Sequence, residues 1–121
     1  MDQMEEKIEE TDELALREQN VFLILNRQIV PLLKKVTRFG RQLDNDVVFH
    51  DETVSRIHAE IRYEGEEYVL YDNSSTAGTY VNSKRISRCA LVSSDLISFS
   101  HVQMMFVNNN AKLAGKAMGV T

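Results

Sequence analysis

Residues 57–63 read Ile-His-Ala-Glu-Ile-Arg-Tyr, and this stretch carries the clearest β-strand pattern in the chain. Its apolar side chains fall at every second position, which is the period of a β-strand with one buried face and one wet face. The pattern places Ile57, Ala59 and Ile61 on the core face and His58 on the other. Residues 64–67, Glu-Gly-Glu-Glu, form a hairpin-type turn that leads into a second strand.

Further short strands are predicted on both sides of this hairpin, because runs of Val, Ile, Phe and Tyr alternate with clusters of Gly, Asn, Asp and Ser. We expect residues 21–25 to form a strand buried on both sides. The other expected strands cover residues 34–39, 57–63, 68–71, 79–81, 84–86, 96–99 and 102–107. No gap between them holds a helix with its own apolar stripe, so we expect antiparallel sheets. About eight to eleven short strands predict an all-β fold, an antiparallel β-sandwich of two sheets.

Charge divides the 121-residue chain unevenly. Residues 1–20 carry eight acids and two bases, a net charge of -6, whereas the remaining residues carry ten acids and twelve bases, a net charge of +2. A surplus of +2 is too small for a general nucleic-acid surface, and we expect no nucleic-acid partner. It is sufficient to bind one phosphate group.

The domain boundaries follow these changes in composition. We expect residues 1–19 to form a flexible acidic arm, either frayed helix or disordered, residues 20–108 to form the sandwich domain, and residues 109–121 to form a C-terminal tail, linker or short helix. Cys89 is the only cysteine, no signal segment opens the chain, and no apolar run approaches the roughly 20 residues that cross a bilayer. We therefore predict a cytoplasmic protein without direct membrane insertion.

Short polar motifs recur in the predicted loops, where a rigid sandwich presents its binding groups. They are Gly40-Arg41, Asn45-Asp46-Val47, Ser55-Arg56-Ile57-His58, the stretch from Asp72 to Thr79, and Asn82. In order and spacing these motifs resemble the forkhead-associated (FHA) domain, and the resemblance covers about residues 21–107. It implies a β-sandwich that binds phosphothreonine peptides.

The residue types also suit a phosphate on physical grounds. A phosphate monoester carries about -1.5 to -2 charges at pH 7 and three strong acceptor oxygens. Arg41 offers a forked guanidinium that can engage two oxygens in parallel, and Ser55 and Thr76 offer hydroxyl groups.

The resemblance implies a role for each residue of the motifs. Residues matching Arg41, Ser55 and Thr76 contact the phosphate, and the residue matching Arg56 contacts the phosphate or the peptide main chain. Asn82 either holds loops or touches the peptide. The loop-supporting residues are Gly40, which permits a close backbone approach, His58, which braces the loops, Ser75 and Gly78.

Simpler roles stay open for several of these residues. Arg56 could form an ion pair with Asp51 or Glu52, and Ser55 and Thr76 could bond their own backbone in turns. For His58, which could be a ligand, we favour a structural role.

The chain departs from the FHA pattern at three positions. Ala77 stands where the family has an Asn that bonds the peptide backbone beside the phosphothreonine. The loss of this hydrogen bond should weaken peptide binding by about 1 kcal/mol. Ser94 and Ser100 replace glycines near the final hairpin, and we expect them to affect only local turn geometry.

Enzymatic and metal sites are not expected. By strand alternation Ser55 and His58 fall on opposite faces, and no nucleophile elbow or glycine-rich phosphate loop is present. The three histidines lack metal-ligand spacing, so we predict no metal, cofactor or catalytic residue.

We therefore predict a phosphothreonine-dependent interaction module that acts as a signalling adaptor downstream of Ser/Thr kinases. The alternative is a scaffold domain of the same fold that binds its partner independently of phosphate. Thr11, within the acidic arm, is a candidate phosphorylation site, and phosphorylated Thr11 could dock into the site of the same chain or of a neighbour.

Overall fold

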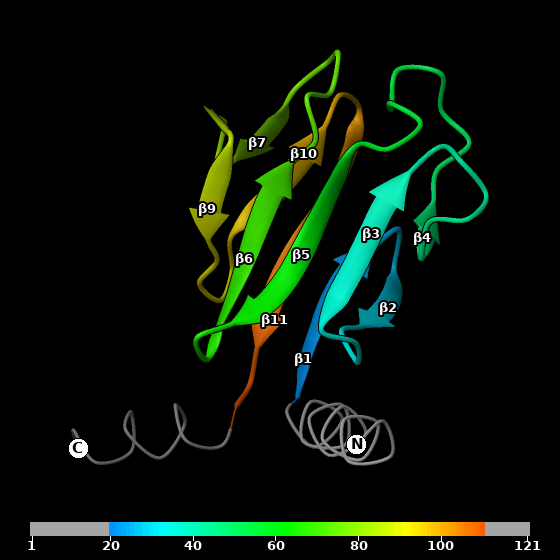
Figure 1. Cartoon of the computed structure of the whole chain (residues 1–121). Helices are drawn as coiled ribbons and strands as arrows, with labels where there is room; N and C mark the ends of the chain where they lie inside the picture. The colour runs from blue at the N-terminus through cyan, green and yellow to red at the C-terminus, as the bar shows by residue number, and fades with distance from the viewer. Residues whose placement is uncertain (1–19, 111–121) are drawn as a thin grey trace, which may run out of the picture.

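The computed structural model describes residues 20–110, which form two β-sheets packed face to face. Figure 1 shows β3, β5, β6 and β9 in the front layer, with the strands of the other sheet behind them. The fold is the predicted all-β sandwich. Within the described residues no helix is long and apolar enough to span a membrane.

The six-stranded sheet, called sheet A below, has the strand order β2-β1-β11-β10-β7-β8. The five-stranded sheet, called sheet B, has the order β4-β3-β5-β6-β9. The strands of sheet A are β1 (Val21–Leu25), β2 (Gln28–Pro31), β7 (Thr79–Val81), β8 (Lys84–Ile86), β10 (Leu96–Phe99) and β11 (Val102–Asn108). Those of sheet B are β3 (Val36–Gly40), β4 (Val47–Val48), β5 (Ala59–Glu64), β6 (Glu67–Asp72) and β9 (Arg88–Ala90).

The hairpin of β5 and β6 follows the sequence prediction closely. Glu64 pairs with Glu67, and the two residues between them, Gly65 and Glu66, have φ angles of 58° and 63°. Two successive positive φ angles define the primed turn whose twist matches that of the flanking strands. Gly65 therefore fits this turn because glycine adopts positive φ without steric cost.

Two burial predictions were wrong. In β1 only one face is buried, because Val21 and Leu23 lie in the core while Ile24 is 39% exposed. At the start of the 57–63 stretch the predicted faces are reversed: Ile57 is 53% exposed and His58 is completely buried. Both residues precede β5, where the backbone follows a loop rather than the period of a strand.

The sheets are not wholly antiparallel, because β4 pairs in parallel with β3. Three short strands, β2, β4 and β9, were not predicted at all. Pro31 closes β2 at the edge of sheet A, where a residue without an N–H group is tolerated. Each of the three unpredicted strands lies at an edge, where burial gives little signal in the sequence.

Aromatic rings fill the core beneath the loops. Phe99 lies between the rings of Phe39 and Phe49, with ring centroids 5.7 and 6.0 Å away, and the His58 ring packs 4.5 Å from it. Edge-to-face rings bury a large apolar area and hold a specific geometry. This cluster gives the loops above it a rigid base.

Candidate functional site

A pocket of about 330 Å³ opens between the loops at one end of the sandwich. Its walls come from four connections: the one after β3, the one before β5, the β6–β7 loop and the β10–β11 turn. The lining residues are Arg41, Glu52, Thr53, Val54, Ser55, Thr76, Ala77 and Ser100. The structure thus brings together Arg41, Ser55 and Thr76, which lie far apart in the sequence.

Arg41 is fixed at the base of its side chain and exposed at its tip. Its backbone N–H donates to the carbonyl oxygen of Ser55 at 3.0 Å, and its Nε donates to the carbonyl oxygen of Val54 at 3.1 Å. The terminal amino groups of the guanidinium have no hydrogen-bond partner among residues 20–110. They remain able to donate to an anion in the pocket.

Ser55 and Thr76 are joined directly, although they belong to different loops. The backbone N–H of Thr76 donates to the Ser55 hydroxyl oxygen at 3.0 Å. A hydroxyl that accepts one hydrogen bond still has its own proton to donate, so Ser55 can serve a ligand as well. The Thr76 hydroxyl makes no hydrogen bond within the described residues, and it lies beside the same pocket.

His58 connects the same two loops from below. Its Nδ1 accepts from the backbone N–H of Ser55 at 3.0 Å, and its Nε2 lies 3.0 Å from the carbonyl oxygen of Gly78. Since a carbonyl only accepts, Nε2 must carry the proton, and these partners fix the neutral tautomer. Burial lowers the pKa of His58 below its usual value, against the opposing influence of the Gly78 carbonyl and the Asp72 carboxylate.

Both ring nitrogens of His58 are therefore occupied by the backbone. The Ser55 hydroxyl faces Thr76 and not the imidazole, so these two residues do not form a nucleophile and its base. The prediction that alternation separates Ser55 from His58 was wrong, because the loop geometry places them in contact.

Asp72 organises the β6–β7 loop that carries Thr76. Its carboxylate accepts from the Ser75 hydroxyl at 2.5 Å, the Ser75 N–H at 3.2 Å and the Thr79 hydroxyl at 2.6 Å. Burial raises the pKa of Asp72, but the hydrogen bonds from Ser75 and Thr79 outweigh burial, and the net pKa lies below the usual value. Gly78, with a φ of 90°, completes the loop in a conformation that favours glycine.

Gly40 allows its loop to contact the loop that contains Ser55 and Arg56. A Cβ atom at Gly40 would lie 2.2 Å from the carbonyl oxygen of Arg56 and 2.7 Å from Nδ2 of Asn45. That same Arg56 carbonyl accepts hydrogen bonds from Asn45 Nδ2 at 2.8 Å and from the Gln42 N–H at 3.1 Å. The backbone contact leaves no room for a side chain at this position.

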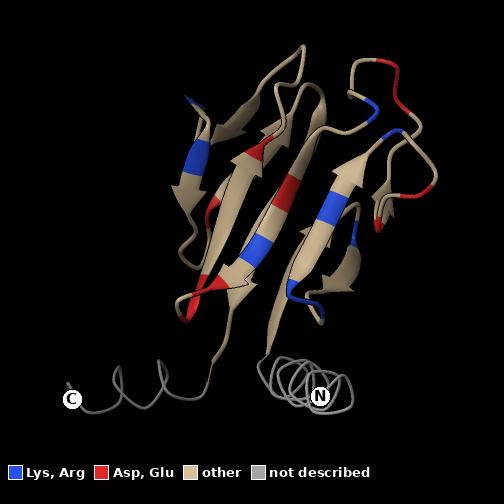
Figure 2. Cartoon of the chain, viewed as in Figure 1, with Lys and Arg blue, Asp and Glu red and all other residues tan. Residues whose placement is uncertain are grey.

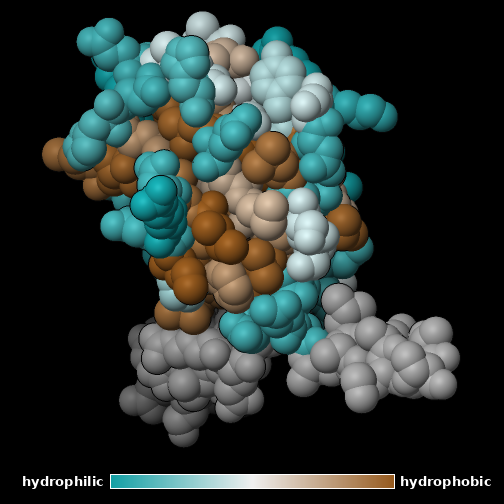
Figure 3. All heavy atoms as spheres, turned by 180° about the vertical axis from the view of Figure 1, so that it is seen from behind, coloured by the Kyte–Doolittle hydropathy of each residue, from teal (hydrophilic) through white to brown (hydrophobic). Residues whose placement is uncertain are grey.

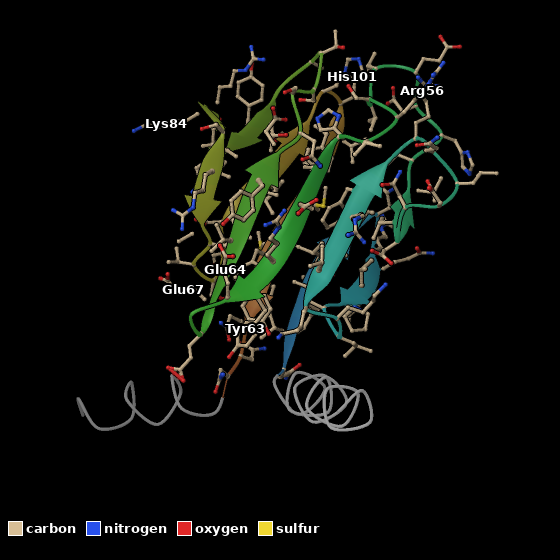
Figure 4. The ribbon with its side chains drawn as sticks, viewed as in Figure 1. Arg56, Tyr63, Glu64, Glu67, Lys84 and His101 are labelled. Carbon is tan, nitrogen blue, oxygen red and sulfur yellow. The ribbon has the colours of Figure 1, made fainter. Side chains whose placement is uncertain are left out.

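Arg56 and Asn82 do not line the pocket. Arg56 is exposed at the loop end of the domain (Figure 4), and its guanidinium forms no ion pair with Asp51, Glu52 or any other described residue. Asn82 bonds the Asp95 carboxylate at 2.8 Å and the Leu96 N–H at 2.9 Å. The Asn82 amide thus holds the β7–β8 turn against β10.

Ser100 was expected to affect only local turn geometry, but it also lines the pocket. It occupies a φ of 56° in the β10–β11 turn, and Ser94 similarly has a φ of 80°. The glycine pattern of the family marks Ser100 as a turn residue, whereas only the fold brings this turn to the other loops. Glu52, Thr53 and Val54 also line the pocket without having been predicted.

Comparisons of the sequence and of the structure with known proteins indicate the same domain family. The model of the FHA domain matches residues 37–100. The glycogen accumulation regulator GarA of Mycolicibacterium smegmatis is 38% identical over 71 residues, which is 59% of this chain and 45% of GarA. This chain therefore spans about half the length of that relative.

Solved structures show the same similarity. The structure of Mycobacterium tuberculosis EmbR in complex with a low-affinity phosphopeptide superposes with a TM-score of 0.71 and 29% identity, covering 80% of this chain and 29% of EmbR. A structure from a study of phosphothreonine-dependent FHA domain interactions superposes with a TM-score of 0.68 and 31% identity, covering 72% of this chain and 94% of the other.

Proposed function

Because this chain belongs to the FHA domain family, we propose that it binds phosphothreonine-containing segments of partner proteins and acts as an adaptor in Ser/Thr kinase signalling. The observation that carries the proposal is the pocket in which the guanidinium of Arg41 and the hydroxyl groups of Ser55 and Thr76 converge. A phosphate needs fixed cations and short donors, and these three side chains can supply both.

The groups of the pocket have separable roles in this proposal. Arg41 binds two phosphate oxygens through its terminal amino groups, and Ser55 and Thr76 donate their hydroxyl protons to the phosphate. Arg56 lies outside the pocket, so its guanidinium acts on the peptide main chain or on residues beside the phosphothreonine. Asn82 acts indirectly by holding its turn.

The proposed role is binding without catalysis. GarA, whose name describes a regulator, is consistent with this role. The engagement of both His58 nitrogens by backbone groups also supports it, since the imidazole is not free to act as a general base for Ser55. We place this function in the cytoplasm because the single cysteine, Cys89, forms no disulfide within the chain, which suits a reducing compartment.

Titration with a library of phosphothreonine peptides, beside the same peptides without phosphate, tests the proposal. We expect measurable binding of the phosphorylated set only, and Arg41→Ala should weaken it at least tenfold because a charge-assisted hydrogen bond contributes roughly 1.5–3 kcal/mol. Arg27→Ala, in the β1–β2 turn, makes the same charge change outside the pocket and should bind like the wild type.

Ala77 supports one alternative, a scaffold of the same fold that binds independently of phosphate. Ala77 lines the pocket and offers no side-chain hydrogen bond to a peptide backbone. Equal binding of both peptide sets, unaffected by Arg41→Ala, would favour the scaffold and contradict the proposed function.

Thr11 lies outside the described residues, and its role as an internal ligand stays a prediction. If phosphorylated Thr11 docks into the pocket of its own chain, the affinity for an outside phosphopeptide should fall. If it docks into a neighbour, the mass of the particle should rise. Unchanged affinity and unchanged mass after phosphorylation would exclude both arrangements.

A further inference from the structure

The outer face of sheet A carries an apolar surface that no described part of the chain covers. Strand pairing places Ile24 opposite both Ile29 and Met105, and Met105 opposite Leu96, so one apolar row crosses four strands. A second row pairs Phe22 with Val107. We call Phe22, Ile24, Ile29, Leu96, Met105 and Val107 the apolar face.

This surface is accessible in the structure. Ile24 and Met105 are each 39% exposed and Ile29 is 64% exposed. In Figure 3, which views the molecule from behind, hydrophobic residues gather over the middle and lower part of this face, with hydrophilic residues around them. A contiguous apolar patch with a polar rim is typical of an interaction site.

The outer face of sheet B is covered differently, by its own polar side chains. The Arg62 and Arg88 guanidinium groups lie over the Tyr71 ring at 4.8 and 5.7 Å, and the Tyr71 hydroxyl donates to Glu64. Arg62 also pairs with Glu60. Among residues 20–110, no polar side chains cover the apolar face of sheet A in this way.

The charge around the apolar face has one sign. The six strands of sheet A contain no Asp or Glu, and the base beside the face is Arg27, in the β1–β2 turn. The other two bases of the sheet, Lys84 and Arg85, lie on β8 at its far edge. Figure 2 shows acidic and basic residues together along the front strands of sheet B, whereas β1, β10 and β11 behind carry neither. The surface therefore suits an acidic segment with interspersed apolar side chains.

Residues 1–19 match that description and enter the domain beside the face. They carry eight acids and two bases, with Met4, Ile8, Leu14 and Leu16 among them. Asn20, which follows them, leads directly into β1, whose outward residues belong to the apolar face. Residues 111–121 leave from the neighbouring β11, but they contain two lysines and no acid. Charge therefore favours the N-terminal segment.

We propose that residues 1–19 dock on the apolar face of sheet A within the same chain. The apolar side chains of the segment contact Ile24, Ile29 and Met105, and its carboxylates lie toward Arg27 in the β1–β2 turn. The inference is independent of phosphate binding, because the pocket lies in the loops at the other end of the sandwich from Asn20 (Figure 1).

Paramagnetic relaxation in the 121-residue chain tests this docking. With Cys89→Ser as background, Gln3→Cys places a single spin label on the segment without changing its charge. We expect the backbone amide signals of Ile24 and Met105 to lose more than half of their intensity, while those of Arg62 and Tyr71 on sheet B keep theirs. Equal intensities on both sheets would overturn the proposal.

Variants on both sides of the contact sharpen the test. Ile24→Thr, or Ile8→Ser with Leu14→Ser in the segment, should restore the lost intensity, and the segment variants leave the sandwich itself unchanged. Leu43→Thr alters an apolar residue that is 79% exposed outside the face and should leave the broadening intact. Persistent broadening in both Ile24→Thr and the segment variant would contradict docking at this face.

A mixed sample distinguishes docking within one chain from docking between two copies of the chain. Spin-labelled chains without ¹⁵N are combined with ¹⁵N-labelled chains without a spin label. Our proposal predicts no broadening at Ile24 and Met105 in this mixture. Broadening there would mean that a second copy supplies the segment, and it would overturn docking within one chain.

Discussion

The rim of the pocket and the layer beneath it use polar side chains in opposite ways. At the rim, the terminal amino groups of Arg41 and the Thr76 hydroxyl have no partners among residues 20–110. In the layer beneath, His58 and Asp72 accept or donate to backbone and side chains of several loops. The difference indicates that the rim is available for a ligand and the lower layer maintains the positions of the rim.

The comparison predicts the largest effect for His58→Ala. This change removes two buried hydrogen bonds and the packing on Phe99, and it should lower the free energy of unfolding by roughly 3 kcal/mol. Denaturant unfolding measures this effect. His101→Ala, on an exposed turn, serves as the control and should change stability little. A loss for His58→Ala as small as that of the control would show that the lower layer does not brace the loops.

Ser55 and Thr76 separate the two roles. Ser55→Ala removes the acceptor for the Thr76 N–H, so it should cost about 1 kcal/mol of stability as well as roughly tenfold in phosphopeptide affinity. Thr76→Val keeps the backbone bond and removes only the free hydroxyl, so affinity should fall by a similar factor with stability unchanged. Calorimetric binding and thermal unfolding of both variants test this, and equal stability losses would remove the distinction.

Ala77→Asn should strengthen binding several-fold, about 1 kcal/mol, because an amide at the rim can bond the peptide backbone. The control is Ala77→Asp, which has nearly the same shape but places a carboxylate near the phosphate and should weaken binding. Titration with one phosphothreonine peptide measures both variants. If Asn fails to improve affinity, the departure from the family pattern is compensated elsewhere on the rim.

The stability of the domain should also depend on pH through His58, which belongs to the lower layer. Burial holds the pKa of folded His58 below its unfolded value of about 6.5. Below that pH the unfolded chain therefore binds more protons than the folded chain. The free energy of unfolding should therefore decrease below about pH 6.5 and level off under the folded pKa. His58→Gln should flatten this part of the profile, whereas His101→Ala should leave it in place.

The sequence could predict the elements whose signal is local. The hairpin at residues 64–67 and the strands β7, β8 and β10 have the predicted positions, because turn residues and alternating apolar side chains specify them directly. The family motifs likewise bring Arg41, Ser55 and Thr76 to one pocket.

Long-range geometry accounts for what the sequence did not show. The buried position of His58 depends on a loop in which its N–H donates to the Phe39 carbonyl at 2.9 Å, and strand periodicity does not apply there. Ser100 reaches the pocket only because β10 and β11 turn beside the β6–β7 loop. The parallel pairing of β4 rests on two residues, too few to give a pattern.

The neighbouring backbones of Asn20 and Asn109 have a consequence for how this domain can be joined to other polypeptides. The Asn109 N–H donates to the Asn20 carbonyl at 2.8 Å, so the chain enters and leaves the sandwich at almost one point. That point lies at the end opposite the loops (Figure 1). A short linker could join the two positions in a circular permutant, or the domain could be inserted whole into a surface loop of a carrier, with the pocket directed away from the junction.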